Sequence, residues 1–112
     1  MKFLLIIAHE DAFKPTGKLV REIHEWVAAT SKCGARIHGN PLQPSDTATT
    51  VRIRDGKQEV SKGTFSKSKE QICAYELVDC ENRDAAVQIA LKHPMAAAAT
   101  IEVRPIWSEL TQ

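Results

Sequence analysis

The stretch ICAYELVDC, residues 72–80, is typical of a β-strand because apolar side chains recur at alternate positions along it. Successive side chains of a strand point to opposite faces of a sheet. The two predicted faces carry Ile72, Ala74 and Val78 on one side and Tyr75 and Leu77 on the other. Because both faces are apolar, the sheet around this strand needs cover on both sides, and that requirement decides the fold.

The residues before this strand predict a β-hairpin followed by a connecting loop. ATTVRIR (48–54) alternates, KQEV is the returning strand, and Asp55-Gly56 forms a two-residue turn in which both central residues need a positive φ. The loop that follows contains several lysines together with Gly63 and Phe65. Gly63 is expected to supply a backbone angle that other residues resist. Phe65 is expected to anchor the loop in the core or in a dimer interface.

Further strands and two helices flank this region. An apolar run near the N-terminus predicts a strand buried on both faces or nearly so, and apolar residues at helical spacing predict two amphipathic helices. Gly34 is placed to close the first helix, and Asn82 to cap the second. The predicted ranges are strand 2–8, helix 16–33, a short strand from 35 ended by Gly39, Pro41 and Pro44, helix 82–93, and strand 100–107 with Ile101, Val103 and Trp107 on one face.

The order of these elements predicts a single α+β domain over residues 1–112. It is the ferredoxin-like plan, β-α-β-β-α-β, with an inserted hairpin between its two halves. In such a domain both helices cover one face of an antiparallel sheet, and the other face is left open. Apolar side chains on that open face favour a second copy of the chain as its cover, so we expect a homodimer.

Composition excludes several classes of partner. A net charge of +1 and an aromatic content of 5% give no reason to expect nucleic acid or an acidic membrane. The apolar run in MKFLLIIAHED is too short for a signal peptide or a membrane span. Three cysteines without CxxC spacing, and HE pairs that lack the second histidine of HExxH, predict neither disulfide, metal site nor cofactor. We expect a cytoplasmic protein.

Several stretches in a fixed order are similar to a known family. Through them the chain resembles the YCII-related proteins, in particular their DGPF-domain branch, and the resemblance implies a dimeric α+β barrel. One departure is that Lys62 and Thr64 stand where the family motif has aspartate and proline, so no role of that aspartate is carried over. The stretches are MKFLLII (1–7), GNPLQP (39–44), ATTVRIRDG (48–56), KGTFSKSKEQICAYELVD (62–79) and HPMAAAATIEVRPI (93–106).

The resemblance implies two kinds of function. One relative is similar to a dehydrochlorinase of a chlorinated hydroxyquinol, and a His–Asp pair of the YCII branch suggests acid–base chemistry. That pair falls near His24 and Asp46 of this chain. Relatives that neighbour or are fused to alternative sigma factors suggest a regulatory role instead. The two hypotheses are therefore an enzyme acting on a small anionic or phenolic molecule and a non-catalytic ligand-binding or regulatory module.

Five residues are candidates for the site. His24 would be the catalytic base and Asp46 its orienting acid, because an imidazole with an ordinary pKa of about 6.5 exchanges protons readily near pH 7. Alternatively, His24 is a half-exposed helix residue and Asp46 begins a loop. His9, His38 and Arg104 are candidate ligand-binding residues. Their alternatives are a solvent-facing residue, a residue of the barrel wall, and an ion pair with a strand glutamate.

Overall fold

The computed structural model describes residues 1–110 of the chain, and its elements follow the predicted order. A helix that the sequence did not predict, α3, lies between α2 and the last strand, in the stretch where Pro94 is followed by methionine and alanines. The elements are β1 (Lys2–Glu10), α1 (Gly17–Lys32), β2 (Arg36–Pro41), η1 (Ser45–Thr47), β3 (Thr49–Arg54), β4 (Lys57–Lys62), β5 (Glu70–Asp79), α2 (Arg83–Leu91), α3 (Met95–Ala98), β6 (Thr100–Pro105) and η2 (Ser108–Leu110).

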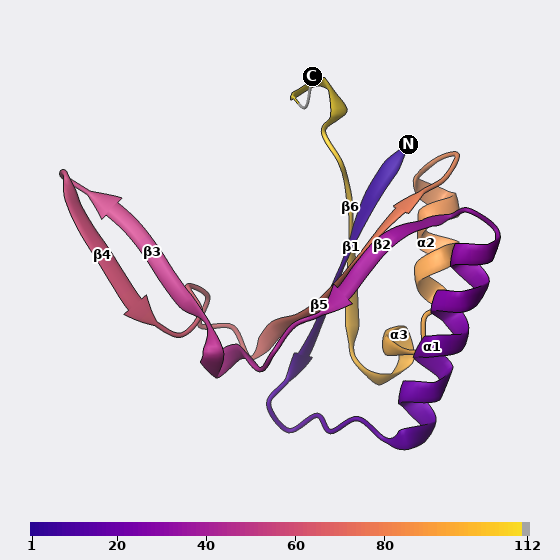
Figure 1. Ribbon diagram of the computed structural model, residues 1–112, viewed down its shortest axis with the longest axis horizontal. Helices are drawn as coiled ribbons and strands as arrows, with labels where there is room; N and C mark the ends of the chain where they lie inside the picture. Colours follow the sequence, from indigo (N-terminus) through magenta and orange to yellow (C-terminus); the bar gives the residue numbers. More distant parts are fainter. Residues whose placement is uncertain (111–112) are drawn as a thin grey trace.

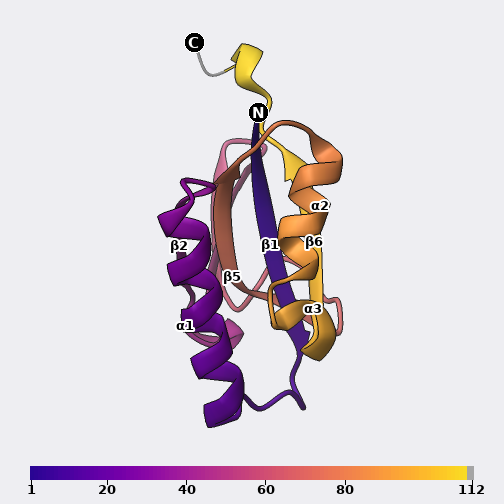
Figure 2. The same cartoon turned by 90° about the vertical axis from the view of Figure 1, so that its right-hand side faces the viewer.

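Four strands form one antiparallel sheet in the order β2-β5-β1-β6, and among the described residues β3 pairs only with β4. This is the ferredoxin-like strand order with the hairpin outside the sheet, so the predicted α+β fold is confirmed. Figure 2 shows α1, α2 and α3 together on one face of the sheet. Within residues 1–110 the other face carries no helix. No helix within residues 1–110 is long and apolar enough to cross a membrane.

The core lies between the helices and the inner face of the sheet. Phe3, Leu5 and Ile7 of β1 are fully buried there, and Trp26 of α1 packs into the same cluster while its Nε1 donates a hydrogen bond of 3.1 Å to the Ile89 carbonyl. The residues that alternate with them along β1, Leu4, Ile6 and Ala8, are only partly buried. In one chain β1 is therefore buried on a single face, unlike the expectation of two.

Local signals placed the helix ends correctly. Gly34 has a φ of 82° directly after α1, and the Asn82 side chain accepts a hydrogen bond of 2.9 Å from the Ala85 backbone N–H. Both features depend on a few neighbouring residues only. They can therefore be predicted from the sequence without knowledge of the tertiary structure.

Two expectations about strand faces were wrong. A register shift between Ile7 and Ala8 pairs Ile7 with Ala74 but Ala8 with Ile72, so Ile72 lies on the outer face and is exposed. A β-bulge of this kind adds one residue and reverses the alternation beyond it. Trp107 lies beyond the end of β6 and is exposed, so it does not share a strand face with Ile101.

The β3–β4 hairpin forms an arm that projects from the open side of the sheet, away from the helices (Figure 1). Its turn is confirmed, with φ of 52° at Asp55 and 75° at Gly56. The radius of gyration is 15.9 Å, against about 13 Å for a compact domain of this length. The arm therefore makes the chain more extended than a compact domain.

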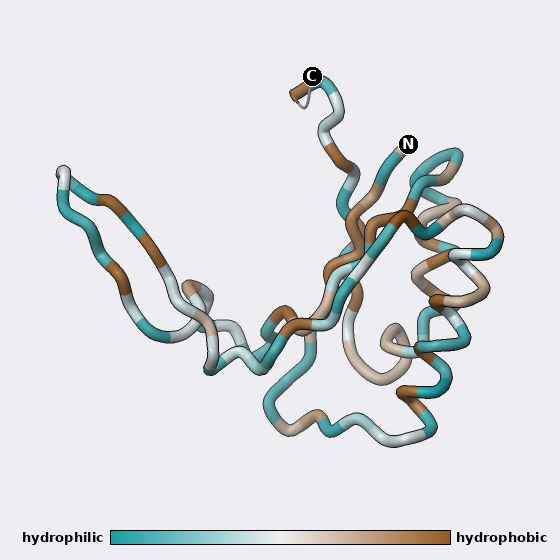
Figure 3. Tube along the Cα trace, in the orientation of Figure 1, coloured by the Kyte–Doolittle hydropathy of each residue, from teal (hydrophilic) through white to brown (hydrophobic). Residues whose placement is uncertain are grey.

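One face of the arm is apolar and unpacked. Val51 pairs with Val60, and these two residues and Ile53 share that face. Each is at least 63% exposed, and the apolar positions stand out along the arm in Figure 3. A two-stranded hairpin alone is at best marginally stable in water. The apolar face of the arm therefore lacks a partner within residues 1–110 of one chain.

The loop after the arm has one predicted and one unpredicted feature. Gly63 has a φ of 95°, as expected, and its N–H donates a hydrogen bond of 2.8 Å to the Ala48 carbonyl. The Thr50 hydroxyl donates a hydrogen bond of 2.7 Å to the Gly63 carbonyl. Phe65 is 72% exposed, so it does not anchor the loop in the core, and its alternative place in a dimer interface stays a prediction.

Candidate functional site

A cleft of about 440 Å³ lies between α1 and the inner face of the sheet. Its walls are mainly apolar and include Ile7, Ile23, Ala74 and Met95. The polar side chains that line the cleft are those of His9, His24, Arg36, Glu76 and His93. An apolar hollow with a few polar groups is the usual form of a small-molecule site.

Arg36 and Glu76 form a buried ion pair in this cleft. Arg36 is on β2 and Glu76 on the adjacent β5, and Arg36 Nε lies 2.6 Å from Glu76 Oε2. Only 17% of the arginine side chain and 7% of the glutamate side chain are exposed. Arg36 Nη2 also donates a hydrogen bond of 3.0 Å to the Gly39 carbonyl. Each charge is therefore compensated by the other, which is the condition for burying either.

Gly39 makes room for this pair. It stands directly opposite Glu76 in the β2–β5 pairing. A Cβ at position 39 would clash with the Glu76 carboxylate and with the backbone oxygen of Tyr75. The glutamate side chain can therefore lie across β2 only because residue 39 has no side chain.

His93 is the second buried polar group of the cleft. It is 2% exposed, and its ring contacts Trp26 edge-on at a centroid distance of 4.5 Å. The Met95 backbone N–H donates a hydrogen bond of 3.0 Å to His93 Nδ1. Burial lowers the pKa of His93 from 6.5 to about 4. The imidazole is therefore neutral at pH 7, and because Nδ1 accepts a hydrogen bond, Nε2 carries the proton.

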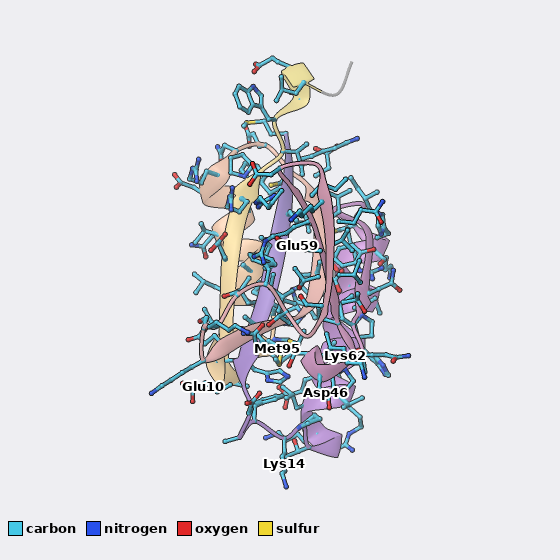
Figure 4. All side chains as sticks on the ribbon, turned by 90° about the vertical axis from the view of Figure 1, so that its left-hand side faces the viewer. Glu10, Lys14, Asp46, Glu59, Lys62 and Met95 are labelled. Atoms are coloured by element: carbon cyan, nitrogen blue, oxygen red, sulfur yellow. The ribbon has the colours of Figure 1, made fainter. Side chains whose placement is uncertain are left out.

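The two residues of the predicted acid–base pair lie in different places. His24 is exposed on α1 and lines the cleft. Asp46 is exposed in η1 at the foot of the arm (Figure 4) and is not among the residues that line the cleft. Within residues 1–110 no hydrogen bond or ion pair joins these two side chains. The pairing of His24 with Asp46 therefore stays a prediction.

The three candidate ligand-binding residues are also separated. His9 lines the cleft and stacks on Phe13 at a centroid distance of 4.7 Å. His38 lies outside the cleft, and its Nδ1 is 3.3 Å from the Tyr75 hydroxyl. Arg104, on β6, pairs with Glu102 at 3.2 Å and is exposed, as its alternative interpretation described. His9 is thus the candidate ligand-binding residue that lines the same cleft as His24.

Sequence reasoning missed Arg36, Glu76 and His93. A signal for Glu76 was present, because it occupies the position between Ala74 and Val78 on the inner face of a predicted strand. A charged residue at an inward position requires a buried partner of opposite charge. The identity of that partner depends on the pairing of β2 with β5, which the sequence alone does not state.

Comparison with known proteins agrees with the fold. Residues 1–109 match the YCII-related domain, so the chain belongs to the YCII-related family. The chain is also 34% identical over 67 residues to an uncharacterized protein, R00369, of Rhizobium meliloti (strain 1021). The match covers 58% of this chain and 54% of that protein, so the chain spans about half the length of this relative.

Burial of neutral His93 predicts a loss of stability in mild acid. Between pH 6.5 and pH 4 the unfolded chain binds a proton at this residue that the folded chain does not bind. The free energy of unfolding should therefore fall by up to about 3 kcal/mol as the pH drops through that window. His93→Asn removes the titration and keeps an acceptor for the Met95 N–H. Urea unfolding at pH 7 and pH 4.5 should show a smaller loss for this variant, and equal losses would contradict the assignment.

Proposed function

We propose that this chain binds a small, mostly apolar molecule in the cleft between α1 and the sheet, and that His24 exchanges a proton with it. The observation that carries the proposal is the position of an accessible histidine on the wall of an apolar cleft of about 440 Å³. That volume lies within the usual range for small-molecule pockets. A histidine on the wall of such a cleft can reach a bound molecule, and this supports a role as general acid or base.

The reaction class is proton transfer. In an isomerisation His24 would take a proton from one atom of the ligand and return it to another. In an elimination His24 would take a proton from a carbon atom of the ligand. The electron pair of the broken C–H bond would form the new double bond, and the neighbouring carbon would release an anionic leaving group to solvent. Neither reaction needs a further oxidant or reductant. The proposal requires His24 at the cleft and does not require Asp46.

The second candidate function is a ligand-binding or regulatory module without catalysis. It is favoured by one observation: within residues 1–110, no side chain that could orient His24 is bonded to it. General bases are usually oriented by a third group. The same cleft would then bind its ligand without chemical change.

Hydroquinone and chlorohydroquinone, kept under anaerobic conditions, are the probes that separate these functions. Binding is followed by NMR chemical-shift changes at cleft residues such as Ala74, and turnover by chloride release and by the ultraviolet spectrum. His24→Gln should preserve binding and lower turnover by about 10²- to 10⁴-fold. Glu25→Gln is the matched control, because Glu25 is exposed on the same helix and does not line the cleft.

Three results are informative. Turnover that His24→Gln abolishes and Glu25→Gln preserves supports the enzyme. Binding at the cleft without turnover supports the non-catalytic module. If neither probe changes the NMR chemical shifts of cleft residues, the proposal that this cleft is the binding site is overturned.

We further propose that the protein is a homodimer in which the arm of one copy covers the open sheet face of the other. The arm has an apolar face built on Val51, Ile53 and Val60. The open sheet face offers partly buried apolar side chains, among them Ile6 and Leu77. Figure 1 shows that the arm of a chain does not fold back onto its own sheet. Two apolar surfaces that do not meet within one chain can be buried together between two copies.

Sedimentation equilibrium tests this assembly. The wild type should sediment at twice the chain mass of 12.4 kDa. Val51→Ser combined with Val60→Ser should raise the dimer dissociation constant at least tenfold, because it removes apolar area from the interface. Arg52→Ser combined with Glu59→Ser changes the opposite face of the arm and is the control. A monomeric wild type, or equal effects of the two double variants, would contradict the proposal.

A further inference from the structure

We propose that a second hollow, next to the cleft, binds the protonated amino group of a primary amine through acceptors on His9, Gln71 and Asp11. The inference goes beyond the proposed function, because it concerns a separate space and a ligand of a different chemical class. Its failure would leave the proposal for the cleft unchanged.

The second hollow has a volume of about 330 Å³ and lies where the end of β1, the start of β5 and the stretch before η1 come together. Its volume is within the usual range for small-molecule sites. The hollow adjoins the cleft, because four residues line both spaces. These are His9, Phe13, Leu42 and Cys73.

His9 offers the first acceptor. Its Nδ1 lies 2.7 Å from the Glu10 carbonyl oxygen, which can only accept a hydrogen bond, so the neutral ring carries its proton on Nδ1. The same carbonyl accepts a hydrogen bond of 3.0 Å from the Phe13 N–H, which closes the turn after β1, and the His9 ring stacks on Phe13. The turn therefore holds the imidazole in one orientation, with the lone pair on Nε2.

Gln71 offers the second acceptor. It stands directly opposite His9 in the β1–β5 pairing, and the Cβ atoms of such a cross-strand pair are about 4.5–5.5 Å apart. Its Nε2 donates hydrogen bonds of 3.0 Å to the Ser66 carbonyl and 2.7 Å to the Ser68 carbonyl, which accounts for both donors of the amide. The amide group is thus held in place, and its Oε1 is left as an acceptor.

Neither acceptor is sealed inside the protein. Within residues 1–110, no fully buried side-chain nitrogen or oxygen lacks a hydrogen-bond partner. His9 Nε2 and Gln71 Oε1 have no partner among these residues, so both atoms must be open, and both residues line the hollow. A single ligand atom that bridges two acceptors must carry at least two hydrogens.

The charge of the hollow favours a cation. Asp11, in the turn after β1, also lines it, and its carboxylate forms no ion pair within residues 1–110. No lysine or arginine is among the described residues that line the hollow. A protonated amino group has three N–H donors, so it can bridge His9 and Gln71 and keep a third donor for Asp11. A hydroxyl group has only one donor, and an anion would be repelled by the carboxylate.

Butylammonium, butyltrimethylammonium and butyrate are the probes, titrated into the wild-type protein at pH 8 and followed by NMR. At this pH an ordinary imidazole is neutral and a primary alkylamine is protonated. Butylammonium should shift Ser45 and Gln71, which line the hollow and not the cleft, and leave Ala74, which lines the cleft and not the hollow, unchanged. It should bind about tenfold more tightly than butyrate and than butyltrimethylammonium, which has the same charge without an N–H donor.

Two variants separate hydrogen bonding from charge. His9→Phe keeps a ring to stack on Phe13 and removes Nε2, so it should weaken butylammonium about fivefold or more and leave butyltrimethylammonium within a factor of about two. Asp11→Asn removes the charge and should weaken both cations. Asp84→Asn is the matched control, because Asp84 is exposed on α2 and lines neither space.

Long-range proton–nitrogen NMR correlation at pH 8 tests the orientation of His9 without a ligand. His9 should carry its proton on Nδ1, and His93, whose Nδ1 accepts a hydrogen bond, should carry it on Nε2 and is the internal control. A proton on Nε2 of His9, equal affinities for the two cations, or shifts confined to Ala74 would overturn the inference. A complete absence of shifts with butylammonium would also overturn it, and the cleft would still be tested by its own probes.

Discussion

The buried ion pair between Arg36 and Glu76 is the constraint on which this structure depends most. It joins the edge strand β2 to β5, at the point where Gly39 leaves room for a carboxylate. Moving either charge out of water is costly, and a single buried charge without its partner is strongly destabilising. The position of the glycine, the pairing of the two strands and the sign of both side chains are therefore mutually dependent.

The same pair gives the cleft its chemical character. Because the two opposite charges lie 2.6 Å apart, each compensates the other on the wall of the cleft. His93 adds to this character, because Trp26 and the Met95 N–H hold its ring in a buried and uncharged state. His24 differs from these groups in being exposed, which suits a residue that exchanges protons. In the proposed function His24 exchanges the proton, and the Arg36–Glu76 pair and His93 form part of the wall of the same cleft.

Much of the fold could be predicted from the sequence, because its signals are local. The turn at Asp55-Gly56 and the cap at Asn82 each depend on a few neighbouring residues. The bulge that moves Ile72 to the outer face depends on how β5 pairs with β1, and no local pattern marks it. For the same reason, the alternation that placed Val78 correctly in the core failed for Ile72.

The site was only partly predictable, for a related reason. His9 and His24 could be selected by residue type, and both line the cleft. Arg36 could not be selected, since its role arises from a contact with Glu76, 40 residues away along the chain. Glu76 itself could have been found from its inward position on a predicted strand. A charged residue at an inward position of a predicted strand therefore indicates a site as well as an exposed histidine does.

The most direct test of the account is a double-mutant cycle on the ion pair, measured as the free energy of unfolding in urea at pH 7. Arg36→Met and Glu76→Leu should each lower that free energy by about 3–5 kcal/mol, because each leaves one buried charge unpaired. The double variant should be more stable than either single variant. Single variants that lose under about 1 kcal/mol, or losses that simply add in the double variant, would contradict the central role of the pair.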